Sequence, residues 1–312
     1  MTSPPRNRIL KFSMYRILGT TFAALAGLAF GSFLNVVVTR WPAEESVVRP
    51  GSHCRNCDRF LSWWENIPVL SWILLKGRCR TCRSWIGWRY PLVELAVAVS
   101  WALAVWNFAG WRPDSISASG GMAVSILSLA GQIVFFWLMV ALAALDAENL
   151  WLPDAITLPG IGLGILLVVL EAAFTPVSPF LAATESAAVI VARAAIGAGA
   201  GILIAAGLIL FIRWIYWLIR RREGIGLGDV KLVAMLVAWL GFFPGMLAFG
   251  LGVALGAAVA LVLLVVFMMQ SKTEEWALTK LPLGTFLCIG GIISGLWAQK
   301  IIGAYMYLSG IF

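Results

Sequence analysis

Seven long stretches of this chain contain no ionisable side chain, and they constrain its fold more than any other feature. An α-helix needs about 20 consecutive apolar residues to cross a lipid bilayer, and six of the stretches have room for one such helix. The stretch between Lys231 and Lys272 is far longer and contains the turn signal Phe243-Pro244-Gly245, which divides it in two. We therefore predict eight membrane-spanning helices, with approximate limits 17–39, 92–111, 120–145, 156–173, 187–212, 231–243, 246–269 and 282–301.

The composition excludes a soluble or a disordered protein. Apolar residues make up 61% of the chain and charged residues 12%, with a mean hydropathy of +0.91. A soluble domain carries about twice this share of charged residues. The net charge of +8 is attributed to membrane topology rather than to a nucleic-acid partner, because Lys and Arg collect in cytoplasmic loops. The predicted fold class is an all-α polytopic membrane protein whose first apolar stretch is a retained helix, since no small-residue cleavage site follows it.

The distribution of basic residues predicts the orientation of the helices. With eight spans, the loops after the first, third, fifth and seventh helices lie on one side of the membrane. These loops and their edges hold 16 of the 23 Lys and Arg residues, which predicts that this side is cytoplasmic. The N-terminal tail opposes this orientation with four basic residues, but it does not outweigh the loops. Both termini are therefore placed on the opposite side.

The largest polar insertion, residues 40–90, contains two CxxC pairs separated by 21 residues: Cys54 with Cys57, and Cys79 with Cys82. Four thiolates at this spacing are typical of a closed tetrahedral zinc site with a structural role. The alternatives are two disulfides or four unrelated thiols, and a cytoplasmic location favours the metal. His53, the only histidine of the chain, is interpreted as a bystander, and its isolation excludes histidine triads and HExxH chemistry.

Acidic residues at the predicted span edges form a second candidate site. Asp146 ends the third span, and Asp229 begins the sixth within Gly226-Leu227-Gly228-Asp229. Because two spans separate them, both lie on the side of the membrane that carries the cysteine loop. Asp154 can equally be the N-cap of the fourth span. Two neighbouring carboxylates share one proton, so that one activates water while the other polarises a scissile carbonyl. This pattern predicts a peptide-bond hydrolase for substrates that lie in the membrane.

Six ordered motifs along nearly the whole chain resemble the bacterial type IV prepilin peptidases, which are leader peptidases and N-methyltransferases. They begin with Gly31-Ser32-Phe33-Leu34-Asn35-Val36-Val37, followed by Arg40 and Pro42, and with Trp64-Glu65-Asn66-Ile67-Pro68. They continue with Lys76-Gly77-Arg78-Cys79-Arg80-Thr81-Cys82 and Arg89-Tyr90-Pro91-Leu92-Val93-Glu94. The last two are Asp146 with Leu152-Pro153-Asp154, and Gly226-Leu227-Gly228-Asp229-Val230-Lys231-Leu232.

The resemblance implies an inner-membrane aspartic protease of the GxGD type with Asp146 and Asp229 as the catalytic pair. It implies cleavage of prepilins and type II secretion pseudopilins after a glycine, followed by methylation of the new N-terminal residue from S-adenosylmethionine. Four further residues are expected to support the bound substrate or the loop beside the catalytic pair: Gly226, Gly228, Lys231 and Asp154. The expected parts are a tail (1–16), a first helix (17–39), the Cys₄ zinc loop (40–91) and a transmembrane peptidase domain (92–312).

The residues themselves explain methylation less well, because no glycine-rich loop follows a strand. Five polar groups at span ends beside the cysteine loop are candidates, and an equal interpretation is that they anchor helices and fold the loop: Asn35, Arg40, Glu65, Arg89 and Glu94. Two other functions stay open, a GxGD protease without methyl transfer and a proton- or cation-coupled transporter. The transporter is disfavoured because the chain shows no internal repeat and its acids lie near span edges.

Overall fold

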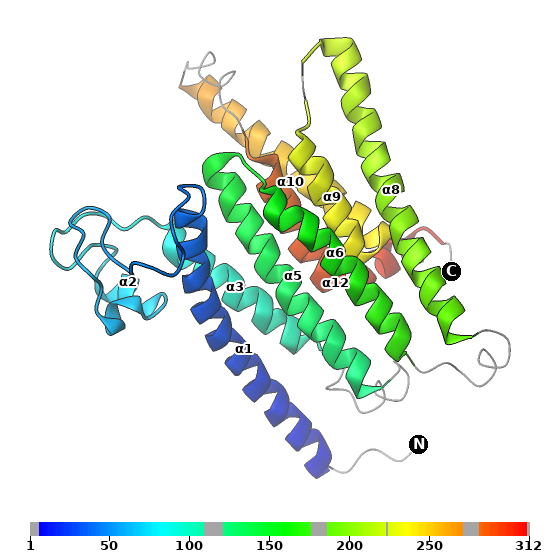
Figure 1. The fold of residues 1–312 in the computed structure, drawn as a ribbon, viewed down its shortest axis with the longest axis horizontal. Coiled ribbons are helices and arrows are strands. Elements are labelled where there is room, and N and C mark those ends of the chain that lie inside the picture. The colour runs from blue at the N-terminus through cyan, green and yellow to red at the C-terminus, as the bar shows by residue number, and fades with distance from the viewer. Residues whose placement is uncertain (1–5, 109–120, 176–185, 223, 271–280, 311–312) are drawn as a thin grey trace. The chain divides into compact units, whose positions relative to one another are not determined.

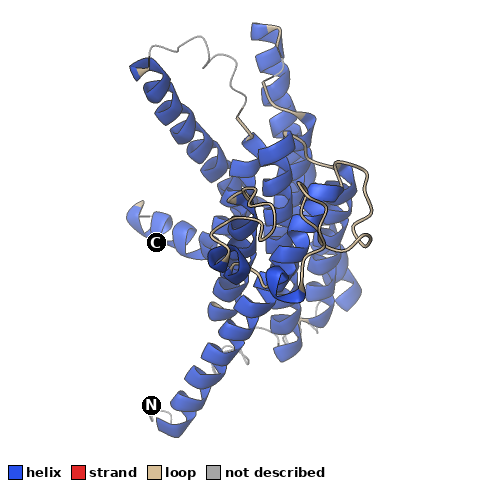
Figure 2. Cartoon of the chain, turned by 90° about the vertical axis from the view of Figure 1, so that its left-hand side faces the viewer, coloured by secondary structure: helices blue, strands red, loops and turns tan. Residues whose placement is uncertain are grey.

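The computed structural model describes residues 6–108, 121–175, 186–222, 224–270 and 281–310. Within these ranges the chain is helical, and its only extended pairings are two isolated bridges. Figure 2 shows the same composition of helices joined by loops. The contacts divide the chain into two compact units, residues 1–115 and 116–312. The predicted all-α membrane architecture is thus confirmed.

The first unit contains two long helices and the cysteine loop between them. Its elements are α1 (Arg6–Arg40), the 3₁₀-helix η1 (Trp63–Asn66), α2 (Leu70–Leu74) and α3 (Arg89–Trp106). Helices α1 and α3 pack closely because α1 presents glycines to the α3 backbone. A Cβ added at Gly27 would lie 2.7 Å from the Cα of Ala98, and one at Gly31 would lie 2.7 Å from the Cα of Glu94. Such small residues let membrane helices approach each other, and the packing groups the second predicted span with the first.

The second unit is a helical bundle around one short central helix. Its described helices are α5 (Met122–Asn149), α6 (Asp154–Phe174), α8 (Ala187–Arg220), α9 (Leu227–Leu240), α10 (Phe242–Met269) and α12 (Leu283–Leu308). Helix α9 contacts α6, α8, α10 and α12, and eight of its 14 residues are buried. Figure 1 shows α9 among α6, α8 and α10.

The predicted spans correspond to eight helices of the described chain, and they differ from the prediction mainly around α9. Seven of the helices are long and apolar enough to cross a membrane. With 14 residues, α9 is about 21 Å long, which is less than the ~30 Å hydrocarbon core. The turn after it lies at Gly241, where φ is +84°, rather than at Phe243-Pro244-Gly245. Pro244 instead lies in the first turn of α10, where a missing N–H costs no helical hydrogen bond.

The helix directions bring the acidic segments to one end of the second unit. Helix α5 ends and α6 begins there, and α8 ends and α9 begins there, at the upper end of this unit in Figure 1. Asp146 lies in the last turn of α5, and Asp229 lies in the first turn of α9. The connectivity therefore gathers both predicted catalytic acids, as the parity of the spans requires.

Candidate functional site

Asp146 is a buried carboxylate held by the start of α12. Asp146 is only 5% exposed. The Oδ2 atom accepts a hydrogen bond from the backbone N–H of Thr285 at 2.7 Å and lies 3.2 Å from the Thr285 hydroxyl. That hydroxyl also lies 3.0 Å from the carbonyl oxygen of Ala143. Because it has one hydrogen, it donates either to this carbonyl or to Asp146. One oxygen of Asp146 is thereby fixed in position.

Asp229 is fixed in a similar way by the beginning of its own helix. Its Oδ2 atom accepts a hydrogen bond from the backbone N–H of Gly226, the N-cap residue of α9, at 3.1 Å. A carboxylate in the first turn also interacts favourably with the positive end of the helix dipole. Within the described residues, no hydrogen bond occupies the Oδ1 atom of Asp229 or of Asp146. Each acid therefore keeps one oxygen for chemistry.

The two acids lie close enough for their charges to interact. Cys288 of α12 is fully buried in the same part of the unit. A buried thiol without a metal is a small apolar residue. Neighbouring carboxylates in a medium of low dielectric cannot both ionise readily, so the pair favours a state with one shared proton. Such a state can act at once as a general base and a general acid.

The side chain of Leu152, in the segment between α5 and α6, packs against the glycines beside each acid. A Cβ added at Gly228 would lie 3.2 Å from the Leu152 Cβ, and one at Gly284 would lie 2.9 Å from its Cδ1. The Gly284 Cβ would also lie 2.9 Å from the Cγ and Oδ2 atoms of Asp146. Glycine at these positions is thus required for the acids to be packed this closely.

Asp154 pairs with a neighbouring helix instead of capping its own. The N-cap of α6 is Pro153, and no side chain caps this helix end. The carboxylate of Asp154 binds the ammonium of Lys231 on α9, with Nζ–Oδ1 and Nζ–Oδ2 distances of 2.6 and 2.8 Å. Both side chains are substantially exposed, at 58% and 35%. An exposed pair of this kind contributes about 0–1 kcal/mol, and it links the beginnings of α6 and α9 beside the acids.

A cation on α8 holds the loop that leads into α9. The Arg213 guanidinium donates to the backbone carbonyl of Ile225 at 2.6 Å. A Cβ at Gly224 would lie 2.6 Å from the ring of Tyr216, so the loop also packs closely on α8. Because Ile225 precedes Gly226, this contact positions the residue that donates to Asp229.

The four predicted metal ligands come together in the cysteine loop. The sulfur atoms of Cys54, Cys57, Cys79 and Cys82 all lie within 4.8 Å of one another, and all four thiols are free. The Sγ atoms of Cys54 and Cys82 are 3.8 Å apart. A tetrahedral zinc ion with Zn–S bonds of about 2.3 Å has sulfurs about 3.8 Å apart, so the spacing fits this metal. The group does not include His53, whose Nδ1 lies 3.1 Å from the Gly51 carbonyl oxygen.

The two CxxC pairs lie in turns of the same geometry. The N–H of Cys54 donates to the carbonyl of Arg59, and the N–H of Cys79 donates to that of Ser84, both at 2.9 Å. The Ser84 hydroxyl lies 3.1 Å from the sulfur of Cys82 and lowers the pKa of this thiol to about 5, whereas burial and the neighbouring thiols raise the pKa of Cys57 to about 11. The thiolate is the form that binds metal, so a bound cation is needed for all four sulfurs to be ionised together.

The five methylation candidates take part in folding of the first unit. The Arg40 guanidinium donates to the carbonyls of Ser46 and Gly51 at 3.0 and 3.1 Å, which ties the beginning of the loop to the end of α1. The carboxylate of Glu65 accepts two hydrogen bonds from Arg59, at 2.6 and 3.0 Å, and these hold its pKa at about 2. These contacts are the ones that the loop-folding interpretation requires.

The other three candidates join α1, α2 and α3. Arg89 donates to the Thr39 hydroxyl, and Glu94 accepts the backbone N–H of Val69 at 2.7 Å. The amide nitrogen of Asn35 donates to the Tyr90 carbonyl at 2.9 Å. Among the described residues, the Oδ1 atom of Asn35 is buried without a hydrogen-bond partner. Asn35 therefore keeps an unused acceptor.

Sequence reasoning did not identify Gly284, Thr285 or Arg213 as parts of the site. Thr285 is 139 residues from Asp146, and neither it nor Gly284 is acidic or basic. The one available signal was the Pro282-Leu283-Gly284 segment at a span start, since glycine beside a helix start permits close approach. Arg213 was counted only as a topological charge.

Comparison with known proteins adds independent findings. Profiles described as "Bacterial Peptidase A24 N-terminal domain" and "Type IV leader peptidase family" match residues 25–108 and 133–261. A "Prepilin leader peptidase/N-methyltransferase" of Pseudomonas putida is 32% identical, covering 93% of this chain and 94% of its own length. A protein of the same description from Burkholderia pseudomallei strain 1026b is 38% identical, covering 86% and 82%.

A "Type 4 prepilin-like proteins leader peptide-processing enzyme" of Escherichia coli O78:H11 is 34% identical, covering 90% of this chain and 95% of its own length. No solved structure matches the chain significantly. The matches to relatives extend over both compact units.

Proposed function

The chain belongs to the type IV leader peptidase family, and we propose that Asp146 and Asp229 are the pair with which it cleaves prepilin leaders. It is a multi-pass membrane enzyme with prepilin leader peptidase and N-methyltransferase activities. One observation carries the assignment of the pair. Two interacting carboxylates lie at one end of the second unit, each anchored through one oxygen by a backbone N–H.

In the proposed reaction, the ionised acid removes a proton from water as the water oxygen attacks the scissile carbonyl carbon. The protonated acid donates a hydrogen bond to the carbonyl oxygen, which develops negative charge. The proton then passes to the leaving amine as the C–N bond breaks, and no covalent intermediate forms. Thr285 and Gly226 hold the Oδ2 atoms, so the Oδ1 atoms face water and substrate.

We propose that the substrates are prepilins and type II secretion pseudopilins, cut after a glycine. Residues beside the pair are proposed to support this substrate, with Gly226 and Gly228 at the start of α9 and Lys231 and Asp154 linking α6 with α9. The basic loops support an inner-membrane orientation with the active site on the cytoplasmic face.

We propose that the cysteine loop, residues 40–91, holds one structural Zn²⁺ through Cys54, Cys57, Cys79 and Cys82. Four thiolates leave no open coordination position, so the ion would stabilise the fold of the loop and take no part in catalysis. The remaining transmembrane part, residues 92–312, is proposed to serve leader cleavage.

We propose S-adenosylmethionine as the methyl donor. The α-amine that accepts the methyl group exists only after the leader has been cut, so methylation follows cleavage. Among the five candidate residues, Asn35 is the first to test, because its Oδ1 acceptor is buried and unused within the described residues. This unpartnered acceptor lies near the end of α1, where the cysteine loop begins, and it supports a role for Asn35 in methylation.

Mass spectrometry of a candidate pilin, from cells with and without this protein, tests the proposed function. Loss of the leader and gain of one methyl group should both depend on the protein. Leader loss without methylation would identify a protease that lacks methyl transfer. An unprocessed pilin, together with ion flux through the purified protein, would favour a transporter.

A further inference from the structure

The cysteine loop presents an apolar edge that its own fold does not cover. This edge consists of Trp63 from η1 and of Leu70, Ile73 and Leu74 from α2. Trp63 is 81% exposed, Leu74 is 64% exposed, and Ile73 is 58% exposed. Large apolar side chains exposed together in one short segment are typical of an interaction site.

The edge is a built feature of the loop. Leu70, Ile73 and Leu74 have the i, i+3, i+4 spacing that places side chains on one face of a helical turn. Trp72 lies on the other side of the turn, where its ring lies 4.4 Å from that of Trp88 and its Nε1 donates to the Ile86 carbonyl at 3.0 Å. The loop thus packs on the Trp72 side of α2 and leaves the aliphatic side exposed.

The exposed charges of the segment between Glu65 and Glu94 have one sign. Between Glu65 and Glu94 the chain contains no acidic residue, but it contains Lys76, Arg78, Arg80, Arg83 and Arg89. Of these, Lys76, Arg78, Arg80 and Arg83 are exposed. The guanidinium of Arg80 lies over the ring of Trp64, 5.3 Å from its centroid. Aromatic and aliphatic side chains bordered by Lys and Arg are typical of segments that lie in the headgroup region of an anionic bilayer.

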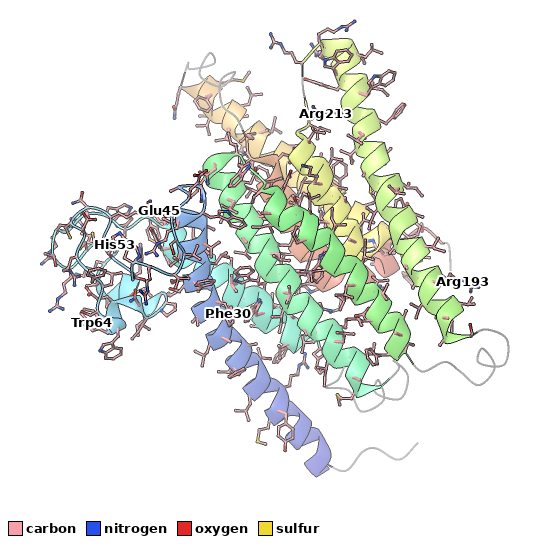
Figure 3. All side chains as sticks on the ribbon, viewed as in Figure 1. Phe30, Glu45, His53, Trp64, Arg193 and Arg213 are labelled. Atoms are coloured by element: carbon pink, nitrogen blue, oxygen red, sulfur yellow. The ribbon has the colours of Figure 1, made fainter. Side chains whose placement is uncertain are left out.

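The edge also lies at the level of a membrane helix. In Figure 3, Trp64, the neighbour of Trp63 in the chain, lies at the lower border of the loop, at about the height of Phe30 in α1, whereas His53 lies higher. Figure 1 likewise shows α2 level with the C-terminal half of α1 rather than beyond its end. Helices α1 and α3 are candidate membrane spans, so the edge lies beside a segment that is expected to cross the bilayer.

We propose that the apolar edge of the cysteine loop inserts into the lipid headgroup region of the membrane that α1 and α3 cross. The exposed basic side chains bind lipid phosphates, and Trp63 occupies the interface that tryptophan favours. The loop therefore lies on the membrane surface, and the Cys₄ cluster is held beside it instead of extending into the aqueous phase.

Photocrosslinking of the full chain in nanodiscs of phosphatidylglycerol and phosphatidylcholine tests this placement. Leu74→p-benzoylphenylalanine and Trp63→p-benzoylphenylalanine place the probe on the edge. Glu45→p-benzoylphenylalanine is the matched control, an exposed acidic position near the end of α1 that lies higher in Figure 3. Intact-mass analysis after illumination measures the fraction of chain that carries a lipid adduct.

The proposal predicts several-fold more lipid adduct at both edge positions than at the control. It also predicts that Arg78→Gln with Arg80→Gln lowers the yield in phosphatidylglycerol nanodiscs and not in pure phosphatidylcholine. Adducts at positions 63 and 74 with a second copy of the chain, or with residues 116–312, would overturn it. An adduct yield no higher than at position 45 would overturn it as well.

Discussion

Replacing Gly284 by Ala should disable cleavage while leaving the bundle folded. The added Cβ would lie 2.9 Å from the Cγ and Oδ2 atoms of Asp146 and from the Cδ1 of Leu152. Carbon atoms in ordinary contact are about 3.5–4.0 Å apart, so Asp146 or α12 must move by roughly 0.6–1.1 Å. Overpacking of this kind costs about 1–3 kcal/mol, and a displacement of about 1 Å at reacting groups lowers the rate by about 10²-fold.

Gly303→Ala is the matched control, because Gly303 lies in the same helix and a Cβ there meets nothing within 4 Å. It should keep the wild-type rate, since alanine only removes the helix penalty of glycine. The assay is the initial rate of prepilin cleavage by purified protein, followed by mass spectrometry, with thermal unfolding measured in the same detergent. Wild-type cleavage by Gly284→Ala would refute the close packing of α12 on Asp146.

Three further variants test other parts of the protein. Asp154→Asn should lower cleavage only mildly, because it removes an exposed pair with Lys231 worth about 0–1 kcal/mol; a loss as large as that of a catalytic acid in the same rate assay would contradict this. Cys54→Ser with Cys57→Ser should abolish binding of one zinc per chain, measured by elemental analysis, and should reduce methylation more than cleavage. Asn35→Ala should reduce methylation of a pre-cleaved pilin and spare leader removal, and equal effects on both would assign Asn35 to folding.

Several features were predictable because a membrane simplifies the physical problem. Lipid cannot satisfy backbone polar groups, so charge-free stretches must be helices, and the positions of the helices follow from the charges. Helix parity then requires Asp146 and Asp229 to share a face. The cysteine spacing predicted the Cys₄ cluster because two short turns position its ligands locally.

Other features depend on contacts between distant segments and were not predictable. The partner of Asp154 is Lys231, 77 residues away, and a helix cap was the equally plausible local alternative. The break before α10 lies at Gly241 because glycine adopts the positive φ that this turn needs, whereas Pro244 fits the first turn of the helix. The contact between Gly284 and Asp146 leaves no periodic pattern in the sequence.

Prepilin cleavage by Asp146→Asn, Asp229→Asn and the double variant tests the catalytic pair most directly. Mass spectrometry measures leader removal, and methylation of a pre-cleaved pilin in the same samples reports that each variant is folded. Each single substitution should abolish cleavage and the double variant should lose no more, because residues that act as a unit are not additive. Methylation of the pre-cleaved pilin should persist in all three. Substantial leader removal by either single variant would exclude that acid from the mechanism.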